Sequence, residues 1–394
     1  MNQNMFGSSF DYEGRLNKLR KLMDERDIDV TLVHSWTNQY YVSGMFQYPW
    51  YPMEADVNSE APVIIFRDKG SEPVFLITWI TSNGVKEATW IKDVRVVNKE
   101  PYGKLGWWEY MAEALREKGV DKGTIGIEED ACVVSTFTRI QSALPKAQFK
   151  RADELFRKAR MIKEPEEIEI IKESVLIGEA GMKAGMEAAK VGVLEDEIQR
   201  AAEMEMKRRG AIREVESMCQ AGIRTANHRA LGTNWKRVEE NELVAIDLGA
   251  VYKGYGCDIC RTWVVGKPTE TYNKIATDIA KIHEKILDFM KPGLTIGEII
   301  EFGANDMRKA GYSTDRLFMP TTGTGEGAVK IHGIGLGPMH DPPDGDREVK
   351  LESGMTLAIS GVVRYANFTI RYEDDVLVVP TGVELINKQI PWKL

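Results

Sequence analysis

Two acidic residues inside one predicted β-hairpin constrain this chain more than any other feature. Residues 243–265 read LVAIDLGAVYKGYGCDICRTWVV, two apolar runs separated by Lys253-Gly254. A Lys-Gly pair between apolar runs indicates a tight turn, so we predict a hairpin here. Asp247 lies in the first run and Asp258 in the second. A carboxylate within an apolar strand is costly to bury unless it is paired or binds a cation.

The length of the turn decides whether the two carboxylates converge. A two-residue turn pairs Tyr252 with Tyr255 and, in the same register, Asp247 with Cys260. Asp258 then lies on the same face as Asp247, one diagonal step away, and the two acids can share a cation. A three-residue turn would place them on opposite faces and prevent this. The alternative interpretation is that both are ordinary solvated acids of edge strands.

Further residues of metal-binding types follow later in the chain. His332 opens HGIGLGPMHDPP, His340 lies eight residues on, and Glu373 lies in the apolar segment IRYEDDVLVV. Carboxylate and imidazole donors suit Mn²⁺, Fe²⁺, Co²⁺ or Zn²⁺ better than a metal that prefers thiolates. Arg371 precedes Glu373 by two residues, so a strand places both on one face. Arg371 either orients an acidic ligand, binds a substrate carboxylate, or forms an ordinary cross-strand ion pair.

Together these motifs resemble the pita-bread superfamily of methionine aminopeptidases, Xaa-Pro aminopeptidases, prolidases and creatinases. The resemblance rests on AIDLGAVYKGYGCDICRTW, HGIGLGPMHDPP and IRYEDDVLV. The segments TNQYYVSG at 37–44 and KARMIKEPEEIEIIKES at 158–174 extend it to a smaller N-terminal domain. The resemblance implies that the metal ligands are Asp247, Asp258, His332 and Glu373, at positions that hold two metals in the metallopeptidase members.

One expected metal ligand is missing. In the metallopeptidase members a further Glu follows a GM-x-x-x-I stretch, which here reads GMTLAIS and places Ser360 at that position. Because Ser is a poor ligand for these cations, we expect a divalent metal (Mn, Fe, Co or Zn) bound as one tight ion instead of two. The segment HGIGLGPMH also has one residue more between Leu336 and His340 than the corresponding motif of the resembling family.

Two histidines are the candidate proton-transfer groups. His228 lies in AGIRTANHRALG, a loop before the first metal-bearing strand. The resemblance matches it to the general base of creatinase-like members, although a lone loop histidine usually has a surface role. His340 matches a histidine that donates to the substrate or to the tetrahedral intermediate. His228, His340 and Arg371 form the predicted catalytic set.

Length and pattern favour two domains. The chain has 394 residues, of which 43% are hydrophobic and 28% charged, enough for two cores. We expect an α+β protein with a small N-terminal α/β creatinase-like domain over 1–155. A C-terminal pita-bread domain over 156–394 should pack helices on a mostly antiparallel sheet. The expected elements are a long helix from Pro165, helices 15–25, 104–117, 271–290 and 296–310, and strands 30–33, 62–66, 74–78, 94–97, 124–127 and 376–379.

Charge and cysteine usage exclude several classes of protein. The net charge of −8 argues against a nucleic-acid partner, and no apolar stretch approaches the ~20 residues that span a bilayer. The N-terminal sequence lacks the features of a signal peptide, so a cytoplasmic location is expected. The four cysteines fit reduced thiols. Cys257 and Cys260 form a CxxC, but a strand points them to opposite faces, so we expect no structural zinc.

Aromatic residues crowd the segment 36–51. GMFQYPWYP contains two prolines and predicts a loop. The aromatics form either domain core or dimer interface, or an aromatic wall over the active site that attracts cationic groups. In the resembling family the N-terminal domain of a neighbouring subunit often closes the site, so we expect a homodimer with this loop as a lid. The aromatics are Trp36, Tyr40, Tyr41, Phe46, Tyr48, Trp50 and Tyr51.

Four functions remain open. The main prediction is a hydrolase of Xaa-Pro dipeptidase or aminopeptidase type that cleaves a C–N bond with metal-activated water. The first alternative is a creatinase- or ectoine-hydrolase-like enzyme acting on a small cationic or zwitterionic substrate, because GAVYKGYGCDICRT looks like the ectoine-hydrolase hairpin. The second alternative is a dimethylsulfoniopropionate lyase, because DICRTW matches the D-I-x-R-T-W pattern of the lyases in this superfamily. The last is a binding-only pita-bread protein.

Overall fold

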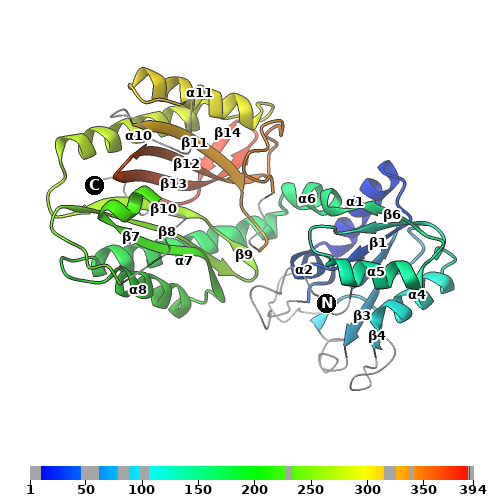
Figure 1. The fold of residues 1–394 in the computed structure, drawn as a ribbon. Coiled ribbons are helices and arrows are strands. Elements are labelled where there is room, and N and C mark those ends of the chain that lie inside the picture. The colour runs from blue at the N-terminus through cyan, green and yellow to red at the C-terminus, as the bar shows by residue number, and fades with distance from the viewer. Residues whose placement is uncertain are drawn as a thin grey trace. The chain divides into compact units, whose positions relative to one another are not determined.

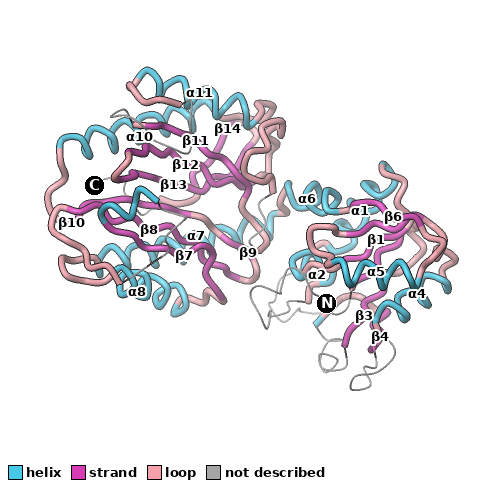
Figure 2. The backbone as a smooth tube through the Cα atoms, viewed as in Figure 1, coloured by secondary structure: helices cyan, strands magenta, loops and turns pink. Residues whose placement is uncertain are grey.

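The chain divides into two compact units. The computed structural model describes residues 10–45, 62–78, 88–97, 106–227, 233, 235–314, 325–337, 341–388 and 390. The units are Met1–Arg160 and Met161–Leu394; the sequence placed the division between residues 155 and 156. Each unit combines helices with a sheet (Figures 1 and 2). No helix in the described ranges is both long and apolar enough to cross a membrane.

The N-terminal unit is built around a six-stranded mixed sheet. Its elements are α1 (Tyr12–Glu25), β1 (Val30–Val33), α2 (Trp36–Ser43), β2 (Val63–Phe66), β3 (Val74–Thr78), β4 (Asp93–Val97), α4 (Trp107–Glu117), β5 (Thr124–Ile127), α5 (Val134–Ala143), β6 (Gln148–Arg151) and α6 (Asp153–Met161). The strand order is β4-β3-β2-β1-β5-β6. β2 pairs antiparallel with β1 and β3, and the other pairs are parallel.

Part of the aromatic segment is helical and buried. Trp36, Tyr40 and Tyr41 lie on α2 and are at most 4% exposed. The guanidinium carbon of Arg15 lies 4.3 Å from the centre of the Tyr41 ring. These three aromatics therefore belong to the core of the N-terminal unit and are not part of an aromatic wall. The remaining members of the segment, Phe46, Tyr48, Trp50 and Tyr51, lie outside the described residues.

The C-terminal unit contains the predicted, mainly antiparallel sheet. Its elements are α7 (Pro165–Ala188), α8 (Glu195–Arg208), β7 (Arg213–Ala221), the 3₁₀ helix η2 (Gly222–Asn227), β8 (Glu242–Tyr252), β9 (Tyr255–Gly256), β10 (Ile259–Val265), α10 (Glu270–Phe289), α11 (Ile296–Lys309), β11 (Glu326–Gly333), β12 (Thr356–Tyr365), β13 (Phe368–Val379) and β14 (Gly382–Leu385). The strand order is β11-β12-β13-β10-β8-β7, and each neighbouring pair is antiparallel. The α+β prediction is therefore confirmed.

Two helix pairs cover one face of this sheet. α7 and α8 pack against β8 and β7, and α10 and α11 pack against β12 and β11 (Figure 1). Val329 and Ile331 of β11 and Ile359 of β12 join the core beneath α10 and α11. Because strand residues alternate between faces, the residues between them point to the opposite face. We call that opposite face the site face; it carries Asp247, Asp258, Ser360, Arg371 and Glu373.

The long helix begins where the sequence predicted. Pro165 is its first residue, which is favourable because the missing N–H of proline would have no helical partner there. The carboxylate of Glu167 accepts a hydrogen bond of 2.8 Å from the backbone N–H of Glu164 and so completes a capping box. Beyond this start, α7 packs, among the strands of the sheet, mainly against β8, the strand that carries Asp247.

Candidate metal centre

The predicted hairpin forms with a two-residue turn. Lys253 and Gly254 have φ of 48° and 88°, and positive values at both positions are those of a type I′ turn. Asp247 is the register partner of Cys260, as the two-residue turn requires. The three-residue alternative is therefore wrong. Asp258 lies directly before β10 and is separated from β9 by Cys257, at the point where the ladder to β8 is interrupted.

Three of the predicted ligands converge on the site face. Asp258, His332 and Glu373 each offer a donor atom, and these atoms lie within 4.8 Å of one another. Nε2 of His332 is 3.3 Å from a carboxylate oxygen of Asp258 and 3.5 Å from one of Glu373. All three side chains are buried. Two carboxylates and an imidazole in a buried cluster fit a divalent cation of the Mn, Fe, Co or Zn type.

The electrostatics of the cluster follow from its burial. Burial by itself lowers the pKa of His332, but hydrogen bonds to Asp258 and Glu373 outweigh it and raise that pKa well above its ordinary value. Burial raises the pKa of Glu373, and the charge of Arg371 offsets this only in part. Grouped buried acids are costly without a compensating positive charge.

Arg371 supplies part of that compensation. Its guanidinium forms one ion pair with Asp247 and another with Glu373. The two acids flank Cys260 in the sheet register, and Arg371 lies two residues before Glu373 on β13. The prediction that Arg371 and Glu373 share one face is confirmed. Arg371 therefore orients two predicted ligands at once, and Asp247 lies beside the three-residue cluster in contact with this cation.

Ser360 lies in the same row of the sheet. It is the register partner of Glu373 on one side and of Lys330 on the other. Its side chain is fully buried, and its hydroxyl has no hydrogen-bond partner within the described ranges. Because a serine hydroxyl is a weak ligand for these cations, Ser360 adds no strong donor to the cluster of Asp258, His332 and Glu373.

Sequence reasoning missed Asp375, which holds the backbone of Asp258 on the site face. Its carboxylate accepts a hydrogen bond of 3.0 Å from the backbone N–H of Asp258. Burial, and then the charge of Asp258, raise the pKa of Asp375 well above its usual value. Asp375 lies two residues after Glu373 and so shares its face. The alternation within IRYEDDVLVV was the signal that would have identified it.

The remaining predicted residues are partly outside the described chain. His228 and His340 both fall in segments that the structure does not describe. The cysteines behave as predicted. Sγ of Cys257 donates to the backbone carbonyl of Ser174 on α7 at 3.4 Å, whereas Sγ of Cys260 lies 3.9 Å from the carbonyl of Arg371. The two thiols therefore point to opposite faces and do not converge on a metal.

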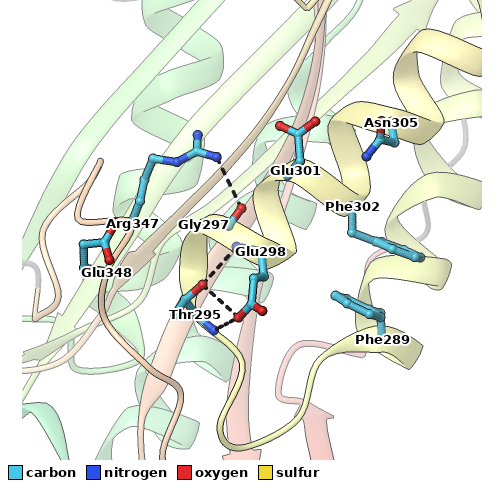
Figure 3. Close-up of a pocket in the computed structure, with 9 residues that line it drawn as sticks. All are labelled: Phe289, Thr295, Gly297, Glu298, Glu301, Phe302, Asn305, Arg347 and Glu348. Carbon is cyan, nitrogen blue, oxygen red and sulfur yellow. Dashed lines mark hydrogen bonds between the residues drawn. The ribbon is translucent and has the colours of Figure 1, made fainter.

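A surface groove on α11 is unrelated to this cluster. The stacked rings of Phe289 and Phe302 form one wall, with ring centres 4.1 Å apart (Figure 3). α11 covers the helix-bearing face of the sheet, so the groove lies on the side away from the site face. It holds none of the predicted site residues. Its lining residues are Phe289, Thr295, Gly297, Glu298, Glu301, Phe302, Asn305, Arg347 and Glu348.

Comparison with known proteins gives consistent relatives over almost the whole chain. Residues 169–380 match the model of metallopeptidase family M24, and residues 15–162 match the creatinase/prolidase N-terminal domain. A Xaa-Pro dipeptidase of Pyrococcus furiosus is 28% identical over 381 residues, which cover 95% of this chain and 97% of that protein. A Xaa-Pro dipeptidase of Lactobacillus helveticus is 26% identical over 375 residues, covering 93% of this chain and 95% of that protein. The crystal structure of the prolidase from Pyrococcus horikoshii matches with a TM-score of 0.80 at 26% identity, covering 96% of this chain and 99% of that one.

Proposed function

We propose that this chain, which belongs to metallopeptidase family M24, is a hydrolase that cleaves the C–N bond before proline in Xaa-Pro dipeptides. The observation that carries the proposal is the buried cluster of Asp258, His332 and Glu373, which falls within the segment that matches the family. Similarity to Xaa-Pro dipeptidases over nearly the full length of both proteins supports the substrate class. The dependence on a divalent metal follows from the family.

The residues of the cluster have distinct tasks in this proposal. A bound divalent cation supplies Lewis-acid activation of water and of the scissile carbonyl group. Asp258, His332 and Glu373, with Asp247 beside them, would hold it. Arg371 fixes the orientation of the two carboxylates that it contacts. The choice among Mn, Fe, Co and Zn, the binding of one ion, and a cytoplasmic location are parts of the same proposal.

The substrate class is tested by a screen of purified protein supplied with Mn²⁺, Fe²⁺, Co²⁺ or Zn²⁺ in turn. We expect hydrolysis of Ala-Pro and Met-Pro and none of Ala-Ala or Pro-Ala. Creatine, ectoine and dimethylsulfoniopropionate are assayed alongside. Turnover of one of these with no Xaa-Pro hydrolysis would replace the dipeptidase proposal by the corresponding small-molecule reaction.

His228 and His340 are expected to transfer protons during turnover. Replacing either by Ala should lower kcat by roughly 10²-fold or more, the usual scale for a lost general acid–base group. The melting temperature should change little, because neither residue is proposed to support the fold. Steady-state kinetics on a Xaa-Pro dipeptide and a thermal melt of each variant provide the check.

His34 provides a contrasting control for these two variants. His34 is buried in the N-terminal unit, and the centre of its ring lies 5.5 Å from the ring centre of Trp107. His34→Ala should therefore lower the melting temperature and leave the kcat of the folded fraction intact. The proton-transfer role is wrong if His228→Ala and His340→Ala show this same pattern.

We further propose a homodimer in which the segment around Trp50 closes the site of the neighbouring subunit. If its aromatic rings face a cationic substrate, Trp50→Ala should raise KM by about 3- to 30-fold, because a cation over an aromatic face gains roughly 0.5–2 kcal/mol. KM for a neutral Xaa-Pro dipeptide should change much less. Tyr41→Ala, on the buried helix α2, is the comparison and should act on stability instead.

Subunit exchange tests where the lid residues act. Assayed with a cationic substrate below the raised KM, the impaired Trp50→Ala protein and the inactive His340→Ala protein should recover part of the activity when mixed, because a heterodimer then contains one intact site. Proven exchange without recovery would show that each chain closes its own site.

A further inference from the structure

The metal centre is assembled across one border within the sheet. Asp258 directly precedes β10, in the half of the sheet made of β7, β8 and β10, whereas His332 and Glu373 belong to the half made of β11, β12 and β13. In the strand order the two halves meet where β10 lies beside β13 (Figure 1). We call this border the seam. The spacing of the ligands from the two halves therefore depends on how β10 and β13 are joined.

Regular backbone pairing occupies only a short part of the seam. Within β10 and β13, both of which the structure describes in full, the register contains a single pair, Cys260 with Glu373. By contrast, β10 pairs with β8 without interruption from Ile259 to Val265. A continuous backbone ladder is what normally fixes the distance between neighbouring strands. At the seam this constraint has to come from other contacts.

Side chains join the strands on both sides of the single pair. Two residues after Cys260, Oγ1 of Thr262 donates to the backbone carbonyl of Arg371 at 3.0 Å and accepts from the backbone N–H of Arg371 at 3.1 Å. Two residues before Cys260, the backbone N–H of Asp258 donates to the carboxylate of Asp375. One hydroxyl thus satisfies both backbone groups that an antiparallel neighbour would otherwise satisfy.

Arg261 joins the strands from the helix-bearing face. Its guanidinium donates across the seam to the backbone carbonyl of Glu373 at 2.8 Å and pairs with the carboxylate of Asp374 at 2.5 Å. The side chains of Arg261 and Asp374 are at most 3% exposed. A planar guanidinium holds several acceptors in a fixed geometry, which a lysine ammonium does not. Arg261 therefore fixes the backbone of Glu373 from the face opposite the metal cluster.

We propose that Thr262 and Arg261 are positioning residues that set the spacing of the metal ligands across the seam. Both act through the backbone of β13. Thr262 holds Arg371, whose side chain orients Asp247 and Glu373, and Arg261 holds Glu373 itself. The inference rests on the proposed metal site. It adds that loosening the seam weakens metal binding in a protein that remains folded, because a cation requires its donors at fixed distances.

Calorimetric titration of metal-free protein with Mn²⁺ tests this inference, together with the visible absorption spectrum of Co²⁺-loaded protein, which depends on ligand geometry. Thr262→Val keeps the shape of the side chain and removes its hydroxyl. It should weaken Mn²⁺ binding by about 10-fold, the lower end of the range for residues that orient metal ligands, and should change the Co²⁺ spectrum. Thr262→Ser restores the hydroxyl and should return both readouts to those of the wild type.

Ser174→Ala is the matched control. The buried hydroxyl of Ser174 on α7 donates to the backbone carbonyl of Ala250 on β8 at 2.6 Å, so it crosses no border between the two halves. Its loss should lower the melting temperature and leave the Mn²⁺ affinity and the Co²⁺ spectrum unchanged. A purely structural role for Thr262 would give this same pattern in Thr262→Val.

Arg261→Lys is a second variant, and it decides the question if Thr262→Val does not fold. It keeps a positive charge beside Asp374 but loses the fork that also reaches Glu373, so Mn²⁺ binding should weaken by about 3-fold or more. The inference is overturned if the folded seam variants bind Mn²⁺ as tightly as the wild type, which leaves the proposed metal site standing. It is also overturned if Ser174→Ala weakens binding equally. A wild type that binds no Mn²⁺ would overturn the metal site and this inference together.

Discussion

Replacing Arg371 by Met is expected to lower the free energy of unfolding by about 3–5 kcal/mol, the usual cost of removing one partner from a buried ion pair. Arg371 is buried and contacts both Asp247 and Glu373. Its removal leaves two buried carboxylates without their cation. For a unit of this size the melting temperature should fall by roughly 6–20 °C. Thermal and denaturant unfolding of metal-free protein measure the effect.

Arg308→Met is the control for this prediction. Arg308 pairs with Glu301 on the surface of α11, where the side chains are 40% and 54% exposed, and such pairs contribute about 0–1 kcal/mol. Saturating Mn²⁺ should restore much of the stability of Arg371→Met, since a cation would again compensate the carboxylates. Similar losses in both variants would show that Arg371 does not carry the charge balance of the cluster.

Replacing Glu373 by Gln is expected to remove both metal binding and activity. The carboxylate is one of three donors within 4.8 Å and is fully buried. A catalytic metal contributes several kcal/mol to transition-state stabilisation, and about 1.4 kcal/mol corresponds to tenfold in rate. We therefore expect kcat/KM to fall by about 10³-fold or more. Glu301→Gln, on the exposed surface of α11, should leave both quantities unchanged.

Metal content distinguishes the two ways in which Glu373→Gln can be inactive. If the residue is a ligand, the variant should bind Mn²⁺ far more weakly than the wild type while remaining folded by circular dichroism. Full activity with normal metal content would show that Glu373 is not a metal ligand. The same measurement on His332→Ala should give the same result, because His332 contacts both acids of the cluster.

The site was predictable from sequence where local rules fix geometry. The Lys253-Gly254 turn determined the hairpin register, and period-two alternation put Arg371 and Glu373 on one face. Pro165 marked the start of α7 because proline is favoured at a first helical position. Each of these inferences uses residues close together in the chain.

Contacts between distant strands could not be derived in the same way. The pairing of Lys330 with Ser360 and of Arg371 with Asp247 depends on the order β11-β12-β13-β10-β8, which no local pattern encodes. Helix α2 was also missed. All eight of its residues are buried, so it has no amphipathic period to detect, and its aromatic and β-branched residues are poor helix formers. The Ser35 cap and burial within the unit impose the helix instead.

The most direct test of the central claim is a metal titration of turnover. Wild-type protein is stripped with a chelator and assayed on Ala-Pro while Mn²⁺ is added in known equivalents. Activity should be absent at the start, rise in proportion to bound metal, and reach its maximum at one ion per chain. Ala-Pro hydrolysis that persists in the stripped protein, or that never appears as the site fills with Mn²⁺, Fe²⁺, Co²⁺ or Zn²⁺, would contradict a metal-dependent Xaa-Pro dipeptidase built on Asp258, His332 and Glu373.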